Sequence, residues 1–303
     1  MTTQDLLLIL AVDQRPWLTK ALWGHTNAVT PDQRAASTRA KHAVLDGLVA
    51  AVEHGVPREA AGILVDAELG PGVAERARAE DVVVSIPLER AGLEIYEDEP
   101  ADVASFLAHY EPDLAKVLVR YNPEGDADAN AIQRQRLAAS SAATRDAGSR
   151  FLFELLVPPT TQQLDAAGGQ EAFENDVRPG LALRAMEEIA AEVPVDVWKL
   201  ERMGSPESYA AAVHLAATEN ATCVLLGAGA PTEQVDAWLA TAAREGFVGF
   251  AVGRSIWWDA VRDLLAGTVD HDQAIASISS RYEHFVDTFL AAGPQKASGG
   301  TSA

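Results

Sequence analysis

The 303-residue sequence has a single cysteine, Cys223, so it cannot form an internal disulfide bond. That residue lies in the apolar run 222–226, which is typical of an unreactive thiol in a hydrophobic core. Long hydrophobic runs are also lacking, because even residues 6–12 fall far short of the roughly 20 needed to cross a membrane. No basic residue precedes that run, and Asp13 follows too soon for a signal peptide, so we expect a cytoplasmic protein.

Positive charge is scarce. The 24 lysines and arginines, only five of them lysines, stand against 44 acidic residues and leave a net charge of −20. This charge repels nucleic acid and anionic membranes, and no run of basic residues compensates for it. We therefore expect a small-molecule partner and leave the oligomeric state open, a homo-oligomer included. A local cluster of cations in so acidic a chain indicates an anion-binding site.

Patterns of metal sites and of serine hydrolases are absent from the sequence. No histidine has the spacing of a metal ligand or follows an expected strand, and no Gly-x-Ser-x-Gly motif occurs. The histidines are His25, His42, His54, His109, His214, His271 and His284. We expect neither a metal nor another cofactor, although Asp13, Asp66 or Glu201 could hold a magnesium ion.

What the sequence does contain is a regular alternation of short β-rich runs and amphipathic, alanine-rich stretches. The expected strands are residues 6–12, 62–66, 82–86, 115–121, 150–156, 195–201, 222–227 and 248–252. The expected helices are residues 31–54, 72–79, 101–109, 130–147, 179–192, 206–219, 231–245, 256–266 and 270–291. Eight strand and helix pairs predict an α/β fold, a single (β/α)8 TIM barrel over residues 1–292, with a flexible tail at 293–303. A doubly wound open sheet shares this alternation, but no Gly-x-Gly-x-x-Gly follows the first strand.

Lys199 is the most unusual residue of this pattern, because it interrupts the apolar strand at residues 195–201. A lysine there must be paired, or must have its pKa lowered enough to act as an amine nucleophile, as in Schiff-base enzymes. In a TIM barrel the chemistry lies at the C-terminal ends of the strands. The polar residues expected at those ends are Asp13, Gln14, Arg15, Asp66, Lys116, Arg120, Glu154, Lys199 and Glu201.

Two lysines and a glutamate are expected to converge inside the barrel. Side chains alternate along a strand, so Lys116 shares a face with Arg120. Lys199 likewise shares a face with Glu201, and Glu154 is the one acid in its apolar strand. Imine chemistry needs these groups: a lysine that attacks a carbonyl, a neighbouring cation that lowers its pKa, and a carboxylic acid that moves protons.

Structural roles are the alternative for the same residues. Lys116 and Glu154 could form a buried ion pair that only holds the barrel together. Asp13 could cap a turn, and Glu201 could be a solvated loop charge.

Glycine-rich loops follow the last two expected strands. Gly227 and Gly229 come after the seventh, and Gly253 and Arg254 come after the eighth, directly before a helix. Exposed amides at a helix N-terminus, with an arginine, are typical of a phosphate site, although ordinary strand-to-helix turns use glycine too. Trp257 and Trp258 are expected to pack the last barrel helix against the strands.

Four segments of the chain are similar to a known family. They are residues 115–123 (AKVLVRYNP), 151–158 (FLFELLVP), 196–201 (DVWKLE) and 249–257 (GFAVGRSIW). They resemble the aldolase-like domain that is fused C-terminal to 5-dehydro-2-deoxygluconokinase in bacterial inositol catabolism. That domain is in turn similar to the class I tagatose-bisphosphate aldolases, and the resemblance extends over nearly the whole chain.

The resemblance implies a class I aldolase that cleaves a phosphorylated keto sugar or keto acid, such as 5-dehydro-2-deoxygluconate 6-phosphate, to dihydroxyacetone phosphate and an aldehyde. It implies that Lys199 forms the imine, Glu154 moves protons, and Lys116 lowers the pKa of the imine lysine and orients the keto group. Asp13 would polarise the hydroxyl at the cleaved bond or position the phosphate-bearing end of the substrate. Among substrate-binding residues, the resemblance implies Gln14, Arg15, Gly253 and Arg254. Their place at the expected strand ends and glycine loops adds Asp66, Arg120, Glu201, Gly227 and Gly229.

The sequence departs from the family pattern in two respects. The kinase half is absent, and Ala228 stands where the family has an arginine after the seventh strand. Other ketose phosphates therefore stay open as substrates, namely tagatose or fructose bisphosphate and sulfofructose phosphate. A non-catalytic phosphosugar-binding barrel, and an isomerase that uses Glu154 as a base without an imine, are the remaining alternatives.

Overall fold

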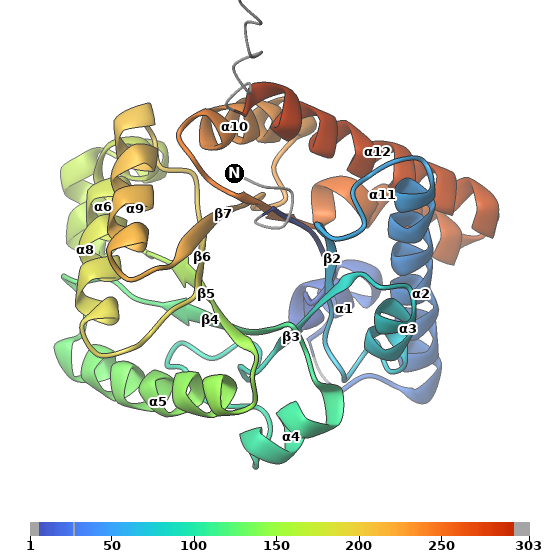
Figure 1. The fold of residues 1–303 in the computed structure, drawn as a ribbon, viewed down its shortest axis with the longest axis horizontal. Helices are drawn as coiled ribbons and strands as arrows, with labels where there is room; N and C mark the ends of the chain where they lie inside the picture. The colour runs from blue at the N-terminus through green and yellow to red at the C-terminus, as the bar shows by residue number, and fades with distance from the viewer. Residues whose placement is uncertain (1–5, 27, 294–303) are drawn as a thin grey trace, which may run out of the picture.

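The computed structural model describes residues 6–26 and 28–293, in which eight parallel strands form a closed barrel. Each strand pairs with the next one in sequence, and the last pairs with the first. The strands are β1 (Leu7–Ala11), β2 (Ala61–Leu64), β3 (Val83–Pro87), β4 (Leu114–Arg120), β5 (Arg150–Leu156), β6 (Val197–Leu200), β7 (Thr222–Leu226) and β8 (Gly249–Val252). The predicted (β/α)8 TIM barrel is confirmed, with strand ends displaced by a few residues (Figure 1).

Helices surround the barrel on its outer face (Figure 1). They are α1 (Arg15–Trp23), α2 (Pro31–Glu53), α3 (Val73–Ala79), α4 (Val103–Tyr110), α5 (Ala127–Asp146), α6 (Thr161–Ala167), α7 (Gln170–Ala172), the π-helical turn η2 (Phe173–Val177), α8 (Arg178–Ala190), α9 (Pro206–Thr218), α10 (Thr232–Arg244), α11 (Arg254–Ala266) and α12 (His271–Ala292). The last helix packs against α2, α10 and α11. The predicted tail falls outside the described residues from position 294 onward.

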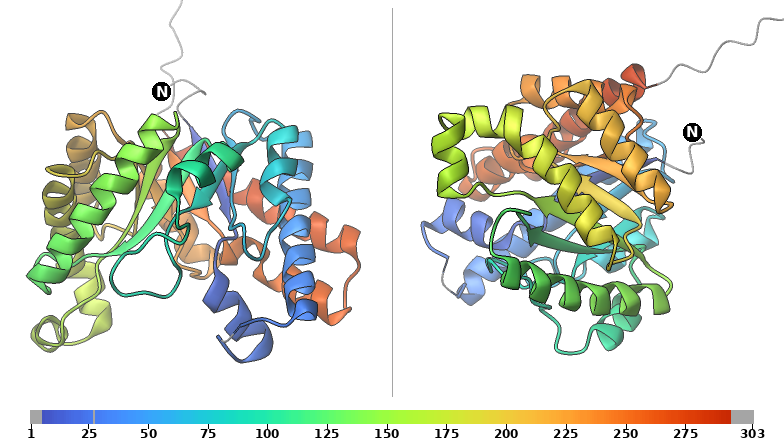
Figure 2. Two further views of the ribbon diagram at one scale, coloured as in Figure 1. Left: turned by 90° about the horizontal axis from the view of Figure 1, so that it is seen from below. Right: turned by 90° about the vertical axis from the view of Figure 1, so that its left-hand side faces the viewer.

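Four helical segments were not predicted, namely α1, α6, α7 and η2. The first of them begins directly after β1 and projects from one end of the barrel, as the side views in Figure 2 show. Pro16 in its first turn has the fixed backbone angle that suits a helix start, and Gly24, at φ 75°, ends it in the left-handed conformation. Residues 15–23, for which the sequence pattern predicted no helix, therefore form a helix with defined ends.

The barrel interior is apolar at one end and charged at the other. The inner apolar cluster includes Leu114 from β4, Leu152 from β5 and Val197 from β6. Each of these is followed two residues later on the same strand by a charged residue, because inward side chains alternate with outward ones. Apolar packing thus closes the barrel below the charged layer, and charge is confined to the C-terminal ends of the strands.

Cys223 is buried in β7, and burial raises the pKa of its thiol. Its predicted place in the hydrophobic core is confirmed. No helix within residues 6–26 and 28–293 is long and apolar enough to cross a membrane.

Candidate active site

A cavity of about 440 Å³ lies at the C-terminal ends of the strands. With one exception, Asp66, every predicted site residue lines it. Those residues are Asp13, Gln14, Arg15, Lys116, Arg120, Glu154, Lys199, Glu201, Gly227, Gly229, Gly253 and Arg254. The residues predicted from their place at the C-terminal ends of the strands therefore nearly all lie at one cavity.

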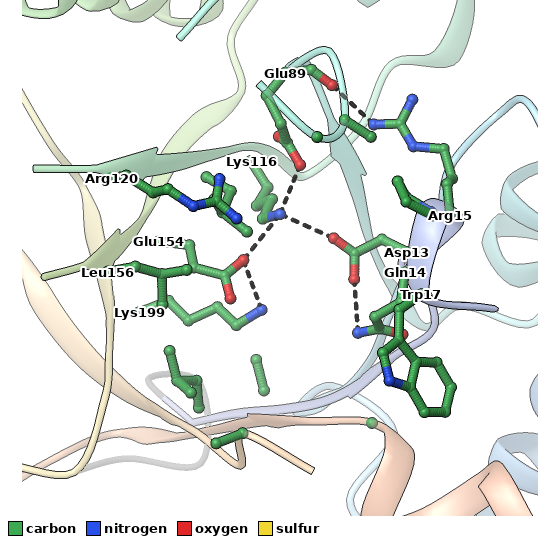
Figure 3. Close-up of a pocket in the computed structure, with 18 of the residues that line it drawn as sticks. Asp13, Gln14, Arg15, Trp17, Glu89, Lys116, Arg120, Glu154, Leu156 and Lys199 are labelled. Atoms are coloured by element: carbon green, nitrogen blue, oxygen red, sulfur yellow. Dashed lines mark hydrogen bonds and ion pairs between the residues drawn. The ribbon is translucent and has the colours of Figure 1, made fainter. Parts of the chain in front are cut away.

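Lys199, Glu154 and Lys116 form a buried charged cluster on three adjacent strands (Figure 3). Glu154 on β5 is the register partner of Lys199 on β6, so the two side chains point into the barrel next to each other. Its Oε2 lies 3.0 Å from the Nζ of Lys199 and 2.8 Å from the Nζ of Lys116. One carboxylate oxygen therefore joins the two ammonium groups.

Lys116 is bound by three carboxylates. Its Nζ lies 2.9 Å from Oδ2 of Asp13, 2.7 Å from Oε1 of Glu89 and 2.8 Å from Oε2 of Glu154. An ammonium has three protons to donate, and these three acceptors match them. Burial acts to lower the pKa of Lys116, but Asp13, Glu154 and Glu89 outweigh it and raise that pKa well above its usual value. Lys116 is consequently a fixed positive charge.

Asp13 and Glu154, which both contact Lys116, stay ionised. Burial acts to raise the pKa of Glu154, but the charges of Lys116 and Lys199 lower it below the usual range. Burial also acts to raise the pKa of Asp13, but the charges of Lys116 and Lys199 outweigh it and lower that pKa well below its usual value. Both carboxylates thus retain their negative charge in spite of burial.

Residues 13–15 (Asp-Gln-Arg) connect β1 to α1 along one side of the cavity. Gln14 donates from Nε2 to Oδ1 of Asp13 at 3.1 Å, so both oxygens of that aspartate are engaged. Arg15 is buried, and its Nη2 donates to the backbone carbonyl of Glu89 at 2.8 Å. This contact ties the start of α1 to the segment that follows β3.

Glu89 is a site residue that the sequence interpretation missed. It follows β3 by two residues, and the expected strand was ended at residue 86, before Pro87. Val83, Ser85, Pro87 and Glu89 nevertheless lie on one alternating face. Extending that alternation past the proline would have found this third carboxylate of the cluster.

The glycine loops after β7 and β8 meet beside the end of β1, because β8 pairs with both β7 and β1. Arg254 donates from Nη2 to the carbonyl of Ala228 at 2.6 Å, and its guanidinium lies 4.9 Å from the ring centre of Trp17. A Cβ on Gly229, whose φ is 74°, would lie 2.7 Å from the guanidinium carbon. A Cβ on Gly253 would lie 2.1 Å from the carbonyl oxygen of residue 11. Both positions require glycine, and Arg254 is held at the N-terminus of α11, where anions bind.

The two adjacent tryptophans of α11 pack as predicted. Trp257 is buried and donates from its indole nitrogen to the carbonyl of Ala11 at 2.9 Å. Trp258 is half-buried against the ring of Trp17, with ring centroids 4.8 Å apart. The helix that carries Arg254 is therefore fixed to the end of β1.

Arg120 and Glu201 lie on the β4 to β6 side of the cavity. Arg120 is half-buried, and its Nη1 donates to the carbonyl of Leu93 at 3.1 Å. Glu201 is joined to Arg178 and accepts a hydrogen bond from the backbone nitrogen of Val157 at 3.1 Å, although burial raises the pKa of its carboxyl. Glu201 is thus not a solvated loop charge.

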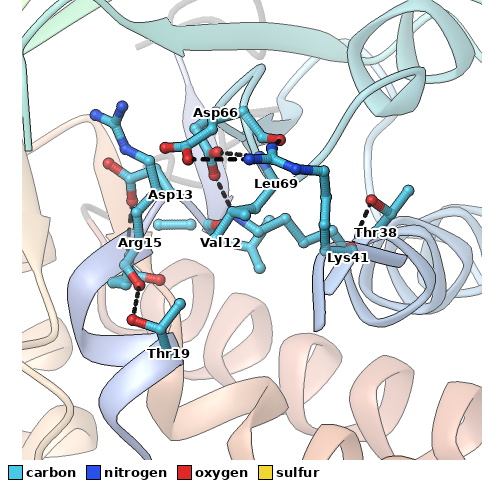
Figure 4. A network of polar contacts seen from close by, with 12 residues as sticks. Val12, Asp13, Arg15, Thr19, Thr38, Lys41, Asp66 and Leu69 are labelled. Carbon is cyan, nitrogen blue, oxygen red and sulfur yellow. Dashed lines mark hydrogen bonds and ion pairs between the residues drawn. The ribbon is translucent and has the colours of Figure 1, made fainter. Parts of the chain in front are cut away.

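Asp66 does not reach the cavity, and its prediction as a substrate-binding residue is wrong. It forms a fully buried ion pair with Lys41, which extends from α2 toward the end of β1 (Figure 4). Oδ1 of Asp66 accepts a hydrogen bond from the backbone nitrogen of Leu69 at 2.7 Å, and the Nζ of Lys41 also donates to the carbonyl of Val12 at 2.6 Å. Both charged groups are satisfied without a ligand.

Within residues 6–26 and 28–293, histidine, cysteine, aspartate and glutamate side chains do not gather in any group of three that could hold a metal ion. The histidines form contacts at the surface, such as His54 with Glu283 and His284 with Asp236. Asp13, Glu89 and Glu154 in the cavity contact lysines, and Glu201 contacts Arg178.

Comparison with known proteins identifies a family and a fold. The profile of a family described as "Uncharacterized protein conserved in bacteria (DUF2090)" matches residues 1–292. No curated protein matches the chain significantly.

Solved structures of similar fold include two fructose-bisphosphate aldolases. The enzyme from Plasmodium falciparum has a TM-score of 0.62 and 12% identity, with 97% of this chain and 94% of that chain covered. An archaeal fructose 1,6-bisphosphate aldolase has a TM-score of 0.60 and 15% identity, with 96% of each chain covered. Cgl0159 from Corynebacterium glutamicum has a TM-score of 0.59 and 18% identity, with 95% of this chain and 88% of that chain covered. At these identities the likeness establishes the fold alone.

Proposed function

The chain belongs to the DUF2090 family of uncharacterised bacterial proteins, and from its cavity we propose that it is a class I aldolase that cleaves a phosphorylated keto sugar or keto acid. The observation that carries this proposal is the contact of Lys199 Nζ with Glu154 Oε2 at 3.0 Å, with Lys116 on the same oxygen. A nucleophilic amine, a proton-transfer group and a fixed positive charge are thereby placed within direct reach of one another.

Imine formation follows from this arrangement. Glu154 takes a proton from the ammonium of Lys199, and the free amine attacks the keto carbon of the substrate. Glu154 then returns the proton to the carbinolamine hydroxyl, which leaves as water, and an iminium links Lys199 to the substrate. Lys116 lies beside both groups and orients the keto oxygen by its charge.

Cleavage uses the iminium as an electron sink. A base removes the proton of the hydroxyl two carbons beyond the iminium carbon, an aldehyde forms, and the bonding electrons move into an enamine on Lys199. Protonation of the enamine and hydrolysis of the regenerated iminium release dihydroxyacetone phosphate. The resemblance assigns the hydroxyl to Asp13, which lies 2.9 Å from Lys116.

The two sides of the cavity suit a substrate with an anionic group at each end. Arg254 and the glycine loops at the N-terminus of α11 offer a phosphate site. Arg15 and Arg120 lie on other sides of the cavity and offer partners for a second anion. Gln14 and Glu201 complete the polar lining.

A substrate of this form is 5-dehydro-2-deoxygluconate 6-phosphate, which would yield dihydroxyacetone phosphate and malonate semialdehyde. Its carboxylate and its phosphate lie at opposite ends, and Arg120 at the end of β4 lies across the barrel from Arg254, which follows β8. Tagatose or fructose bisphosphate and sulfofructose phosphate also carry two anionic ends. We propose the first as substrate and treat the others as comparison compounds.

The test is to supply each compound and measure the release of dihydroxyacetone phosphate by a coupled enzyme assay. We expect release with wild type, no release with Lys199→Met, and no effect of a metal chelator. A wild-type protein that binds these compounds but releases nothing would be a phosphosugar-binding barrel. Exchange of substrate protons with solvent deuterium without bond cleavage would make it an isomerase.

A further inference from the structure

The three carboxylates around Lys116 differ in how far their oxygens are engaged (Figure 3). Oδ2 of Asp13 contacts Lys116, and its Oδ1 accepts from Gln14. Oε2 of Glu154 is shared by the two lysines. Glu89 contacts Lys116 through Oε1, while its Oε2 is buried and has no hydrogen-bond partner among the described residues. Buried polar atoms nearly always have a partner, so this oxygen indicates a ligand group.

That oxygen belongs to a side chain that lines the cavity. The contacts run from Lys199 through Glu154 to Lys116 and then to Glu89, so Glu89 lies beyond Lys116 as seen from the imine nitrogen. The hydroxyl that loses its proton in cleavage is displaced from the iminium carbon by two carbons. Glu89 and Asp13 are the two carboxylates on that side.

We propose that Glu89, rather than Asp13, removes the substrate hydroxyl proton during carbon–carbon cleavage, an inference that rests on the proposed aldolase function. The hydroxyl proton moves to Oε2 of Glu89, and the oxygen–hydrogen electron pair forms the aldehyde carbonyl. The carbon–carbon bond breaks, and its electrons form the enamine and neutralise the iminium nitrogen. In the reverse condensation, protonated Glu89 returns the same proton to the new alkoxide.

Electrostatics favour Glu89 over Asp13 for this step. Burial raises the pKa of Glu89, and the charge of Asp13 raises it further, whereas Lys116 and Arg15 offset only part of the effect. The pKa of Asp13 moves in the opposite direction. A general base works best with a pKa near the working pH, so the carboxylate with the raised pKa is the better acceptor.

Neighbouring groups support a polar substrate segment beside Glu89. The Oε1 of Gln14 and the Nε of Arg15 are also buried without a hydrogen-bond partner in the part of the chain that the structure describes. Both residues line the same cavity, and Arg15 donates to the backbone carbonyl of Glu89. The carboxylate of a malonate semialdehyde half would supply an acceptor for Arg15.

The experiment compares wild type, Glu89→Gln and Asp13→Asn in partial reactions. With dihydroxyacetone phosphate alone we measure the borohydride-reduced adduct and the exchange of its C3 proton with solvent deuterium, neither of which needs a hydroxyl base. Cleavage is measured with 5-dehydro-2-deoxygluconate 6-phosphate and fructose bisphosphate. Each of Glu89→Gln and Asp13→Asn neutralises one of the three carboxylates that contact Lys116, so both variants should lower adduct formation and exchange by similar factors. Cleavage should fall by about 10³-fold more in Glu89→Gln, whereas in Asp13→Asn it should fall only as far as adduct formation does.

Cleavage by Glu89→Gln within about tenfold of wild type, or a selective loss of cleavage in Asp13→Asn, would overturn the assignment. An absence of both adduct and exchange in wild type would instead overturn the aldolase function itself. Wild type that forms the adduct but cleaves neither compound also counts against Glu89. If Glu89→Gln fails to fold, Glu89→Asp and Glu89→Ala replace it: the aspartate should retain part of the cleavage, and formate should restore part of it to the alanine variant only.

Discussion

The protein contains two buried arrangements of lysine and carboxylate, and they differ in what they leave unsatisfied. Lys41 and Asp66 lie between α2 and the end of β1, where both charged groups have partners and neither lines the active-site cavity. The cluster around Lys116 and Lys199 lines a cavity and retains a carboxylate oxygen without a partner among the described residues. Burial of a lysine alone does not indicate chemistry; a polar atom left unsatisfied at a cavity does.

The largest expected difference between the two arrangements is in turnover, and it is tested by removing one lysine from each and measuring cleavage. Lys199→Met should abolish the imine and lower turnover by about 10⁴-fold or more, because no other group can form the covalent intermediate. Lys41→Met should keep turnover within about tenfold of wild type if Lys41 is structural. Steady-state release of dihydroxyacetone phosphate checks both, and equal losses in the two variants would erase the distinction.

Stability should show the reverse order. Removal of Lys41 leaves Asp66 as an unpaired buried charge, which should cost about 3–5 kcal/mol in the free energy of unfolding. The double variant Lys41→Met/Asp66→Asn should recover part of that loss. Urea denaturation measures all three proteins, and an unchanged midpoint in Lys41→Met would mean that water reaches the pair.

A smaller effect is expected at the phosphate side of the cavity. Gly229→Ala places a Cβ against the guanidinium of Arg254 and should raise KM by about tenfold, equivalent to about 1.4 kcal/mol. Gly267→Ala is the matched control, since Gly267 has a φ of 72° but no atom within 4 Å of the new Cβ. It should cost about 1 kcal/mol of stability and leave KM unchanged. An equal rise in KM for both variants would show that backbone strain, not Arg254, is responsible.

The smallest effect is a change in how stability depends on pH. Glu154 has a lowered pKa in the folded state, so its contribution is present above the ordinary carboxyl pKa of about 4 and is lost as pH falls through the lowered value. The pKa of Glu89 is raised, so its ionised form lowers stability as pH rises. Denaturation at several pH values should therefore show opposite slopes for the differences between wild type and Glu154→Gln and between wild type and Glu89→Gln. Parallel slopes would contradict the charge assignment.

Much of the fold and the charged cluster could be predicted because both depend on local pattern. Lys199 and Glu154 stand out as charges in apolar strands, and alternation fixes which face of the strand they share. Strand order then brings β4, β5 and β6 together without further information.

Asp66, Glu89 and α1 could not be placed in the same way. The partner of Asp66 is Lys41, which lies on a helix and is brought to it only by tertiary packing. A proline is typical of the end of a strand, so the expected strand was ended before Pro87. Glu89, two residues farther along the chain on the same face, was therefore not considered. Residues 15–23 form a short helix that the alternation of one strand with one helix does not require, and Trp17 packs against Trp257 and Trp258.

The most direct measurement is to reduce a mixture of the protein and dihydroxyacetone phosphate with borohydride and to map the adduct by mass spectrometry of peptides. The account predicts one stable adduct, on Lys199, with Lys116 unmodified because three carboxylates surround its ammonium group and Lys41 unmodified because it does not line the cavity. The same treatment of Lys199→Met should leave the protein unmodified. An adduct on another lysine, or none in wild type, would contradict the proposal that this cavity performs imine chemistry.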